Sequence, residues 1–525
     1  MQGTCVRYTD LPGTTALFAD YLYRFDRVSR FYDHCPHDVE CYRRSAARVD
    51  FPAERRAALV TALRAMNGDH PALEQLAQPG TYAVVTGQQV GLFSGPAYTI
   101  YKALTAVALA RRLTAAGLPS VPVFWLATED HDFTEVNHAW VFDATHRPVR
   151  LEMPANGTGK RPVGGIGIEQ APIDELRRTL SGFPYGDDVA DAVTGAYAPG
   201  ETLGSAFSKL LTQVLGPNAL PVFDPMHPAG RRLAAPLLSR AVERMPELNA
   251  SVLERNRELN EAGYHAQVHV EDQTSFVFLL ENGERLALHR HEREFVINGR
   301  RLSTPELADR AEQLSPNALL RPVAQDWMLP TIAYVGGPAE LAYLAQSQVL
   351  YHELLGRMPV AVPRQAATLL DARAAKLFDR YGLTLGDFFR GEEGLRERIA
   401  ARLVPSEVSE TIESAKARSA EIHNTVATAL ARFDPSLEAA FAKSRRKMEY
   451  QLDKTARKAA RAALRRNERA SEEAAYLAGL VYPEKHLQER LYSILPFLAR
   501  HGMDLTSRLA EDIKPDCLDH RLIVL

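Results

Sequence analysis

A strand, a glycine-bearing loop, a helix and a second strand follow one another early in the chain. Residues 82–86 and 121–127 are short apolar runs of the kind found in buried strands. Between them, Gly95-Pro96 is typical of a helix start, because proline lacks the N–H that would be unpaired there. Gly117 predicts the end of that helix, since glycine tolerates the positive φ found just past helix ends. This order predicts a βαβ unit, whose two strands run parallel.

The same order of elements returns later in the chain. Residues 331–335 show the apolar pattern of a strand. A Gly-Gly-Pro segment at 336–338 then begins a helical stretch that ends near Gly356. Residues 359–363 show the pattern of another strand. Residues 220–224 add one more apolar run. Two βαβ units in one chain predict an α/β protein built on a parallel sheet.

Residues 150–320 lack this regularity and are predicted to be insertions on the core. Three stretches show the alternation of apolar and polar residues that is typical of short strands: 266–270, 276–280 and 295–297. Asn282-Gly283 and Asn298-Gly299 are dipeptides that favour tight hairpin turns. The insertions should therefore contain short antiparallel strands.

A shift in composition to Ala, Glu, Lys and Arg marks residues 391–475 as a separate helical part. Two series with seven-residue spacing interlock in its first half, and a third follows Pro435, which interrupts the pattern. The three series are Val408, Ala415, Ile422 and Ala429; Ile412, Ser419, Val426 and Phe433; and Phe441, Met448, Thr455 and Ala462. Two long helices that pair as an antiparallel coiled coil are expected.

These patterns divide the chain of 525 residues into three parts. Residues 1–385 are predicted to form the α/β core, with the insertions inside it. Residues 386–475 are predicted to form the helical coiled-coil domain, through which two chains would pair. Residues 476–525 regain apolar side chains and are expected to pack back onto the core.

Charge and composition exclude some partners. The formal net charge is -3, from 62 basic and 65 acidic residues, so neither nucleic acid nor a membrane is expected as a partner. Residues 443–469 carry eleven basic and three acidic residues; phosphate binding is the alternative to a solvated coiled-coil face, which is the commoner use of such a helix. Four cysteines and the lack of an apolar run of about eighteen residues predict a soluble, cytoplasmic protein.

The loop after the first strand is the first candidate for ligand binding. Backbone N–H groups at a helix N-terminus attract anions, and glycines let a ligand approach closely. The candidate residues are Thr86, Gly87, Gln88, Gln89 and Gly91. Their spacing fits neither the Walker loop nor the dinucleotide fingerprint, and a tight turn without a ligand is the alternative.

Glu129, Asp130, His131 and Asp132 directly follow the second strand. Since the carboxyl ends of parallel strands meet at one edge of a sheet, this segment is expected beside the glycine loop. Such close carboxylates repel one another unless they are solvated, paired or bound to a cation. Proton transfer, an ammonium-binding cage, a metal site and a solvated acidic turn are the alternatives. No metal is expected, because consecutive residues rarely all point at one ion.

A third cluster lies around the second βαβ unit. Arg321 is suited to hold a carboxylate or a phosphate with two parallel hydrogen bonds, and a structural ion pair is the alternative. Glu340 lies three residues before Tyr343, so both share one helix face. The other candidates of this cluster are Gln325, Asp326, Tyr334, Gly336 and Gly337.

Several sequence blocks together resemble the bacillithiol biosynthesis cysteine-adding enzyme family. The blocks are 86–92 (TGQQVGL), 95–102, 121–125 (VPVFW), 129–133 (EDHDF), 320–326, 329–340, 488–490 and 494–498. They occur in the order of the family and span about residues 81–500, so the combination is far more specific than any single motif.

The resemblance implies a Rossmann-like core with inserted connective segments and a coiled-coil domain that pairs two chains as a homodimer. It also implies a ligase that forms an amide between cysteine and glucosaminyl-malate, the last step of bacillithiol synthesis. The cysteine carboxyl must be activated for this reaction. Adenylation by ATP would activate it, although the sequence carries no nucleotide fingerprint.

The expected site residues combine the three clusters with the family blocks. The expected catalytic residues are Glu129, Asp130, His131 and Asp132. The expected substrate-binding residues are Thr86, Gly87, Gln88, Gln89, Gly91, Lys102, Trp125, Asn137, Arg321, Gln325, Asp326, Tyr334, Gly336, Gly337 and Glu340. Two other classes stay open: a nucleotidyl- or acyl-transferase of the same fold that acts on another small amine, and a coiled-coil interaction protein.

Overall fold

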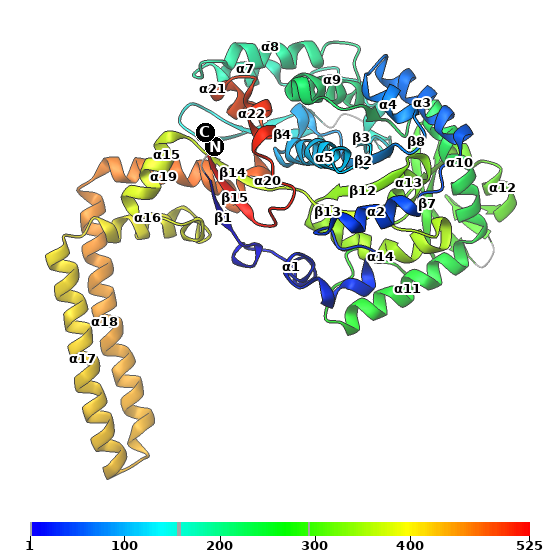
Figure 1. The fold of residues 1–525 in the computed structure, drawn as a ribbon. Helices are drawn as coiled ribbons and strands as arrows, with labels where there is room; N and C mark the ends of the chain where they lie inside the picture. The colour runs from blue at the N-terminus through cyan, green and yellow to red at the C-terminus, as the bar shows by residue number, and fades with distance from the viewer. Residues whose placement is uncertain (1–2, 155–158, 292–293) are drawn as a thin grey trace.

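A large α/β body carries a projecting hairpin of two long helices (Figure 1). The computed structural model describes residues 3–154, 159–291 and 294–525. The two ends of the chain lie close together (Figure 1), because the first strand pairs with the last.

A five-stranded parallel sheet forms the centre of the body. Its strand order is β13–β12–β2–β3–β6, and every neighbouring pair is parallel. The strands are β2 (Tyr82–Gln88), β3 (Ser120–Leu126), β6 (Val222–Phe223), β12 (Thr331–Gly336) and β13 (Val360–Pro363). Both predicted βαβ units and the α/β fold class are thereby confirmed.

The crossover helices end where their glycines predict. α5 (Tyr98–Ala115) connects β2 with β3, and α14 (Pro338–Leu355) connects β12 with β13. Gly117 and Gly356 follow these helices with positive φ, 80° and 69°, a backbone conformation that favours glycine. α5 begins two residues later than Pro96 predicts.

The body contains further helices and one more antiparallel pair of strands. They are α1 (Ala16–Tyr23), α2 (Val39–Ala47), α3 (Ala53–Asn67), α4 (Ala72–Ala77), α6 (Phe133–Val136), β4 (His138–Phe142), β5 (Pro148–Glu152), α7 (Ile173–Leu180), α8 (Gly186–Ala196), α9 (Leu203–Leu215), α10 (Pro228–Glu243), α11 (Met245–Glu261), α12 (Thr304–Ala308), α13 (Arg321–Met328) and α15 (Ala372–Tyr381).

The insertions hold an antiparallel sheet of their own, with strand order β10–β9–β8–β7–β11. Its strands are β7 (Thr274–Glu281), β8 (Glu284–His291), β9 (Glu294–Ile297), β10 (Arg300–Ser303) and β11 (Leu314–Pro316). The strands predicted at 276–280 and 295–297 are confirmed. Both Asn-Gly turns are confirmed too: Asn282 and Asn298 have φ of 54° and 48°, as two-residue hairpin loops require.

The prediction of a strand at 266–270 is wrong, because these residues form no strand in the structure. The backbone of Val268 bonds to a side chain instead of a partner strand. Its N–H donates to Oε1 of Gln346 at 2.8 Å, and its carbonyl accepts from Nε2 of the same residue at 2.9 Å. One amide side chain therefore satisfies both backbone groups that a β-ladder would otherwise have to satisfy.

Two long helices, α17 (Ser406–Phe433) and α18 (Leu437–Arg465), form the antiparallel hairpin, and the chain turns between them at Pro435. Figure 1 shows both helices extending away from the body. α16 (Gly391–Arg402) and α19 (Glu468–Val481) join the hairpin to the body.

The two helices meet along part of the predicted seam. Ile412 and Ser419 are half-buried, and Phe441 and Met448 of α18 both contact His423 of α17. Ile422 and Phe433 of the predicted series are 62% and 83% exposed. The covered residue of α17 is His423, and Lys416 crosses to Asp453 of α18 at 2.9 Å. The series that contains Val408 and Ile422 lies outside the contact, because seven-residue spacing does not determine which of two neighbouring stripes faces the second helix. An apolar stripe is left exposed as a result.

The last part of the chain packs on the body and closes a third sheet. β15 (His520–Val524) pairs antiparallel with β1 (Gly3–Val6) and parallel with β14 (Ala367–Leu370). The helices that precede β15 are α20 (Gln488–Leu491), α21 (Leu495–His501) and α22 (Leu505–Asp512).

A buried ion pair fastens α20 to the end of β13. The Nη1 and Nη2 atoms of Arg364 donate to the two carboxylate oxygens of Glu489 at 2.9 and 2.8 Å. The two side chains are only 4% and 2% exposed. Because water does not solvate either charge, each charge depends on the other.

We expect Glu489→Gln to lower the free energy of unfolding by about 3–5 kcal/mol, because Arg364 then keeps a buried charge without a counter-charge. The shift of the urea unfolding midpoint measures this loss.

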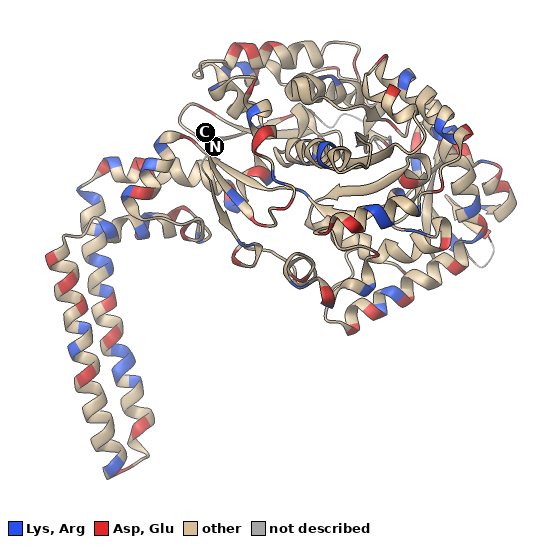
Figure 2. Ribbon diagram, viewed as in Figure 1, with Lys and Arg blue, Asp and Glu red and all other residues tan. Residues whose placement is uncertain are grey.

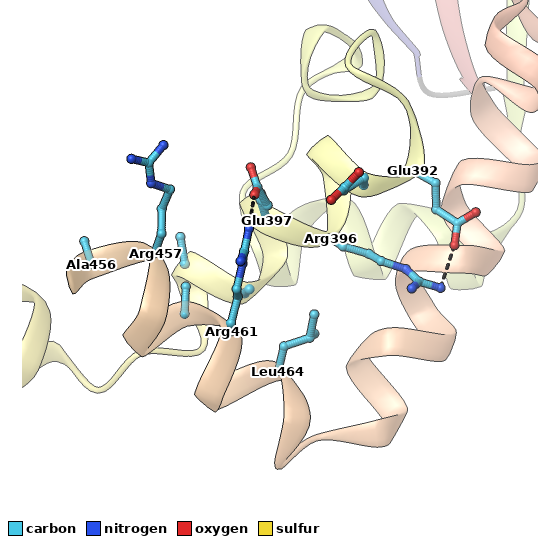
Figure 3. Close-up of a pocket in the computed structure, with 11 residues that line it drawn as sticks. Glu392, Arg396, Glu397, Ala456, Arg457, Arg461 and Leu464 are labelled. Atoms are coloured by element: carbon cyan, nitrogen blue, oxygen red, sulfur yellow. Dashed lines mark ion pairs between the residues drawn. The ribbon is translucent and has the colours of Figure 1, made fainter. Parts of the chain in front are cut away.

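The matched control is Glu392→Gln on α16. Glu392 pairs with Arg396 at 2.6 Å, and these side chains are 48% and 43% exposed. Figure 3 shows this pair beside a surface cavity between α16 and α18. An exposed pair contributes only about 0–1 kcal/mol. Equal midpoint shifts in the two variants would contradict the role given to the buried pair.

Candidate active site

A cavity of about 680 Å³ opens at the carboxyl ends of β2, β3 and β12. Open α/β sheets bind ligands at this edge. The walls come from segments that are distant in sequence: the loops after the central strands, Phe278 and Arg285 of the insertion sheet, and Arg490 of α20. The cavity is therefore complete only when all these segments are folded.

Gly87 shows why the loop after β2 needs glycine. A Cβ atom at this position would lie 2.8 Å from the carbonyl oxygen of Trp125 on β3, which is closer than a side chain tolerates. The glycine is thus required for the close approach of the two strands. This requirement holds with or without a ligand.

Lys102 of α5 reaches back to the end of β2. Its Nζ donates to the carbonyl oxygen of Gly87 at 2.9 Å and to Oε1 of Gln88 at 2.8 Å, and it pairs with Glu340 of α14. Burial, which raises the pKa of Glu340, is outweighed by Lys102 and the N–H of Gly337, so that this pKa lies below its ordinary value. The ion pair joins the two βαβ units at the floor of the cavity.

Arg321 is a cation whose hydrogen-bond partners are neutral. Nη1 donates to Oε1 of Gln325 at 3.0 Å, and Nη2 donates to the hydroxyls of Tyr343 at 2.9 Å and Tyr334 at 3.3 Å. Arg490 lines the same cavity and is exposed. Among the described residues, no carboxylate forms an ion pair with either arginine, so both charges are available to an anionic ligand.

Glu129 is held by a buried arginine. Arg231 of α10 pairs with Glu129 and also donates from Nε to the carbonyl oxygen of Glu312 at 2.9 Å. Burial raises the pKa of Glu129, and the charges of Arg231 and Arg285 oppose this. Glu129 therefore links the end of β3 to the insertion and is not free to move in the cavity.

Asp130 and His131 belong to a network with Gln89 and Arg285. Nε2 of Gln89 donates to Oδ2 of Asp130 and to Oε2 of Glu135, both at 2.6 Å. Nη1 of Arg285 lies 3.2 Å from Nδ1 of His131 and 3.6 Å from Oδ1 of Asp130. A guanidinium only donates, so Nδ1 accepts and the hydrogen of the neutral imidazole is on Nε2.

The His131 imidazole is held neutral. Burial lowers its pKa, and the charge of Arg285 lowers it further, against the opposing effect of Asp130 and Asp132. At neutral pH this side chain therefore provides an N–H donor rather than a positive charge.

Most residues predicted from the sequence line this cavity, and the three predicted clusters surround one space. Those that line it are Gly87, Gln88, Gln89, Lys102, Trp125, Glu129, Asp130, His131, Arg321, Tyr334, Gly337 and Glu340. The indole of Trp125 stacks on Phe223 with ring centroids 5.0 Å apart.

Other predicted residues make structural contacts outside the cavity lining. Thr86 donates from Oγ1 to the backbone of β12 at 2.8 Å. Asn137 donates from Nδ2 to the carbonyl oxygen of Met153 at 3.1 Å. Asp132 caps α6 by accepting from the N–H of Thr134 at 3.1 Å. Its carboxylate therefore stabilises a short helix.

A supporting layer lies behind the arginine of α13. Gln325 donates from Nε2 to Oδ1 of Asp326 at 2.9 Å, and the hydroxyl of Tyr351 donates to Oδ2 of Asp326 at 2.5 Å. Gly336 ends β12, and Gly91 packs closely against the following glycine of its loop. These four predicted residues shape the site from outside the lining.

Several arginines at or beside the cavity were not singled out by the sequence analysis. They are Arg231, Arg285, Arg364 and Arg490. Arg231 and Arg285 lie in the irregular insertion region, where no motif marks them. Arg490 lies in block 488–490, so the family resemblance contained a signal for it.

Two further structural features bear on cofactors and membranes. In the described part of the chain, no group of three or more His, Cys, Asp or Glu side chains is placed to hold a metal ion. Over the same residues, no helix combines the length and apolarity that a bilayer crossing needs.

The fold and the cavity define a class: an α/β protein with a charged cavity at its strand ends and an attached helical hairpin. Residues 1–365 match the family "Bacillithiol biosynthesis BshC, N-terminal Rossmann-like domain", and residues 367–525 match "Bacillithiol biosynthesis BshC, C-terminal coiled-coil domain". The chain belongs to the BshC family of bacillithiol biosynthesis. The resemblance stated from its motifs and the Rossmann-like and coiled-coil fold class are thereby confirmed.

Similar proteins cover the whole chain. A protein of Solibacter usitatus named "Putative cysteine ligase BshC" is 56% identical over 525 residues and 100% of both chains. A protein of the same name from Koribacter versatilis is 38% identical over 99% of each chain. A solved structure from Campylobacter jejuni, named "putative arginyl t-RNA synthetase", covers 87% of this chain and 98% of its own at 12% identity and a TM-score of 0.21, which is too low to support a conclusion.

We expect His131 to titrate below its ordinary pKa of 6.5 and Arg285→Met to raise that pKa toward 6.5, because the substitution removes the neighbouring cation. Between the folded-state pKa and pH 6.5, the folded chain keeps this side chain neutral while the unfolded chain protonates it. Its contribution to stability therefore decreases as the pH falls from 6.5 to the folded-state pKa. Side-chain NMR of the histidines measures the titration.

His138 is the internal control for this experiment. Burial and then Arg150 lower the pKa of His138, so Arg285→Met should leave its titration unchanged. A pKa of His131 that is the same in both proteins would contradict the contact with Arg285.

Proposed function

We propose that the protein is a carbon–nitrogen ligase that joins the carboxyl group of L-cysteine to the amine of glucosaminyl-malate and so forms bacillithiol. Family membership supports the pathway, and the name of the relatives, "Putative cysteine ligase BshC", supports cysteine as a substrate. The observation that carries the proposal is the division of one cavity into an acidic wall after β3 and a basic wall around Arg321. An amino sugar linked to a dicarboxylate has complementary charges for both walls.

The malate carboxylates bind at the basic wall. Arg321 and Arg490 are the best candidates, because the neighbouring cations already have carboxylate partners: Lys102 pairs with Glu340, and Arg364 pairs with Glu489. A guanidinium matches a carboxylate with two parallel hydrogen bonds. The hydroxyls of two tyrosines orient Arg321 for this contact.

The amine of the sugar binds at the acidic wall as an ammonium group. Asp130 and Glu135 share the amide of Gln89 and offer carboxylate oxygens there. The nitrogen must lose a proton before it attacks the cysteine carbonyl, and Asp130 accepts this proton. Glu129 is less suited, because it is bound to Arg231.

In this proposal His131 acts as a hydrogen-bond donor and not as the base. Its neutral imidazole carries the hydrogen on Nε2, so it donates a hydrogen bond. Such a donor stabilises the negative charge that develops on the carbonyl oxygen when the amine attacks.

The cysteine carboxyl must be activated before an amine can attack it, because a carboxylate has no leaving group. Adenylation by ATP would join AMP to this carboxyl group and release pyrophosphate, and AMP would then be the leaving group when the amine attacks. We place the reaction in the cytoplasm, where thiols are kept reduced and ATP is available. No metal is proposed as a resident cofactor.

We expect the purified protein to form bacillithiol from cysteine and glucosaminyl-malate when ATP and Mg²⁺ are present, and not when ATP is omitted. Mass spectrometry of the reaction mixture detects the product. If the product also formed without ATP, this result would contradict the proposed adenylation step.

The same assay tests the rival classes. A transferase for another small amine would consume ATP or an acyl donor without converting glucosaminyl-malate. An interaction protein that acts only through its coiled coil would bind neither substrate. Either result would contradict the proposed ligase.

We expect Asp130→Asn to slow product formation by about 10²–10⁴-fold, the range for loss of a general base, without a large loss of stability. The matched control is Asp132→Asn, two residues further on. Asn still caps a helix well, so this variant should retain a rate close to that of the unsubstituted protein. If the two variants had equal rates, this result would contradict the role of Asp130 as the proton acceptor.

We also propose that two chains pair through the helical hairpin. The exposed apolar residues Val408, Ile422, Val426 and Phe433 lie 14, 4 and 7 residues apart along α17, so they form a stripe on one side of the helix. Tyr450 of α18 is exposed too, and Figure 2 shows the many Lys and Arg residues on that helix. An exposed apolar stripe on a long helix is typical of a surface that packs against further helices.

Light scattering should give twice the chain mass of 58.2 kDa at micromolar concentration. Ile422→Glu should shift the protein toward the monomer, because it places a charge in the apolar stripe. Ala417→Glu is the control: it introduces the same side chain at an exposed position of α17 outside the stripe. A monomer before any substitution would refute the pairing.

A further inference from the structure

The folding of the two chain ends brings two cysteine thiols together. Cys5 lies in β1, and Cys517 lies in the segment that leads into β15. Their Sγ atoms are 3.9 Å apart although the residues are 512 positions apart in sequence. The antiparallel pairing of β1 with β15, in which Cys5 faces Arg521, produces this proximity.

We propose that Cys5 and Cys517 form a reversible dithiol–disulfide pair that is oxidised by low-molecular-weight disulfides and reduced again by the corresponding thiols. In reducing compartments such pairs are usually transient and redox-sensing. Neither cysteine lines the cavity of the proposed ligase, so the proposal is independent of that function.

The exposure of the two thiols sets the order of the reaction. Cys5 is exposed and Cys517 is half-buried, so an incoming disulfide reaches Cys5 first. Burial also raises the pKa of Cys517, which keeps this group as a thiol while the first step takes place. Cys5 is therefore the attacking residue and Cys517 the resolving residue.

The exchange balances in two steps. The thiolate of Cys5 attacks the small disulfide, its S–S bond breaks, and one small thiol leaves while a mixed disulfide forms on Cys5. The thiolate of Cys517 then attacks Sγ of Cys5, and the second small thiol leaves. The protein loses two electrons and two protons, and the small disulfide gains both as two thiols.

Bond closure requires a movement of the two thiols toward each other. The sulfur atoms must approach from 3.9 Å to about 2.05 Å. β1 is the outer strand of its sheet, and Cys5 on it is exposed. The segment around Cys517 is already held in place: Asp516 pairs with Arg112, and Asp519 accepts from the hydroxyl of Tyr23 at 2.7 Å.

The experiment compares the full-length protein with Cys517→Ser after incubation with oxidised glutathione. The unsubstituted protein should become lighter by two hydrogens and yield a linked peptide that contains Cys5 and Cys517. Cys517→Ser should instead retain one glutathionyl group on Cys5, because the resolving thiol is missing. Intact-mass and peptide mass spectrometry distinguish these products.

Two results would overturn the proposal. One is an unsubstituted protein that accumulates the same glutathionyl group on Cys5 as Cys517→Ser does. The other is a Cys5 that reacts in neither protein. Cys35→Ser is the matched control, since it removes another half-buried cysteine and should still yield the linked peptide.

The melting temperature gives a second readout. A disulfide between these positions closes almost the whole chain into one ring and restricts the unfolded state, so oxidation should raise the melting temperature by roughly several degrees. The same oxidant should leave the melting temperature of Cys5→Ser unchanged. A rise of equal size in both proteins would assign the effect to other groups and refute the pair.

Discussion

The contact between Lys102 and Glu340 is the interaction on which the arrangement of the cavity depends. It joins the helix of one βαβ unit to the helix of the other at the floor of the cavity, with Lys102 buried and Glu340 half-buried. Glu340 also accepts from the hydroxyl of Tyr334 at 2.5 Å, and Tyr334 in turn accepts from Arg321. One neutralised ion pair thus sets the position of an arginine that lines the cavity. The glycine loop and the basic wall keep a fixed separation for this reason.

The acidic wall depends on the insertions in a similar way. Adjacent carboxylates after β3 repel one another, and burial adds to the free-energy cost. Arg231 compensates Glu129, and Arg285 approaches Asp130 and His131. The insertions therefore supply the positive charges that allow an acidic segment to persist at the end of a buried strand. A core without them would hold these carboxylates only in solvent.

Local features explain how much of this could be predicted from sequence. Glycine and proline positions act on the backbone next to them, so the βαβ units and both Asn-Gly turns were predictable. The meeting of the three clusters follows from parallel topology. The partners of Val268 and His131 were not predictable, because Gln346 and Arg285 reach them only in the folded chain. Only part of the coiled-coil seam was predictable for a related reason: periodicity does not show which of two neighbouring stripes faces the second helix.

The site is also the last part of the molecule to be finished during synthesis. A ribosome that has completed residue 480 has made every strand of the central sheet, yet Arg364 still lacks Glu489 and the cavity still lacks Arg490. Domains fold as the chain emerges, from the N-terminus onward. A nascent or prematurely released chain could thus form its sheet while holding an uncompensated charge beside an incomplete cavity. A complete cavity wall is in this sense a mark of complete translation.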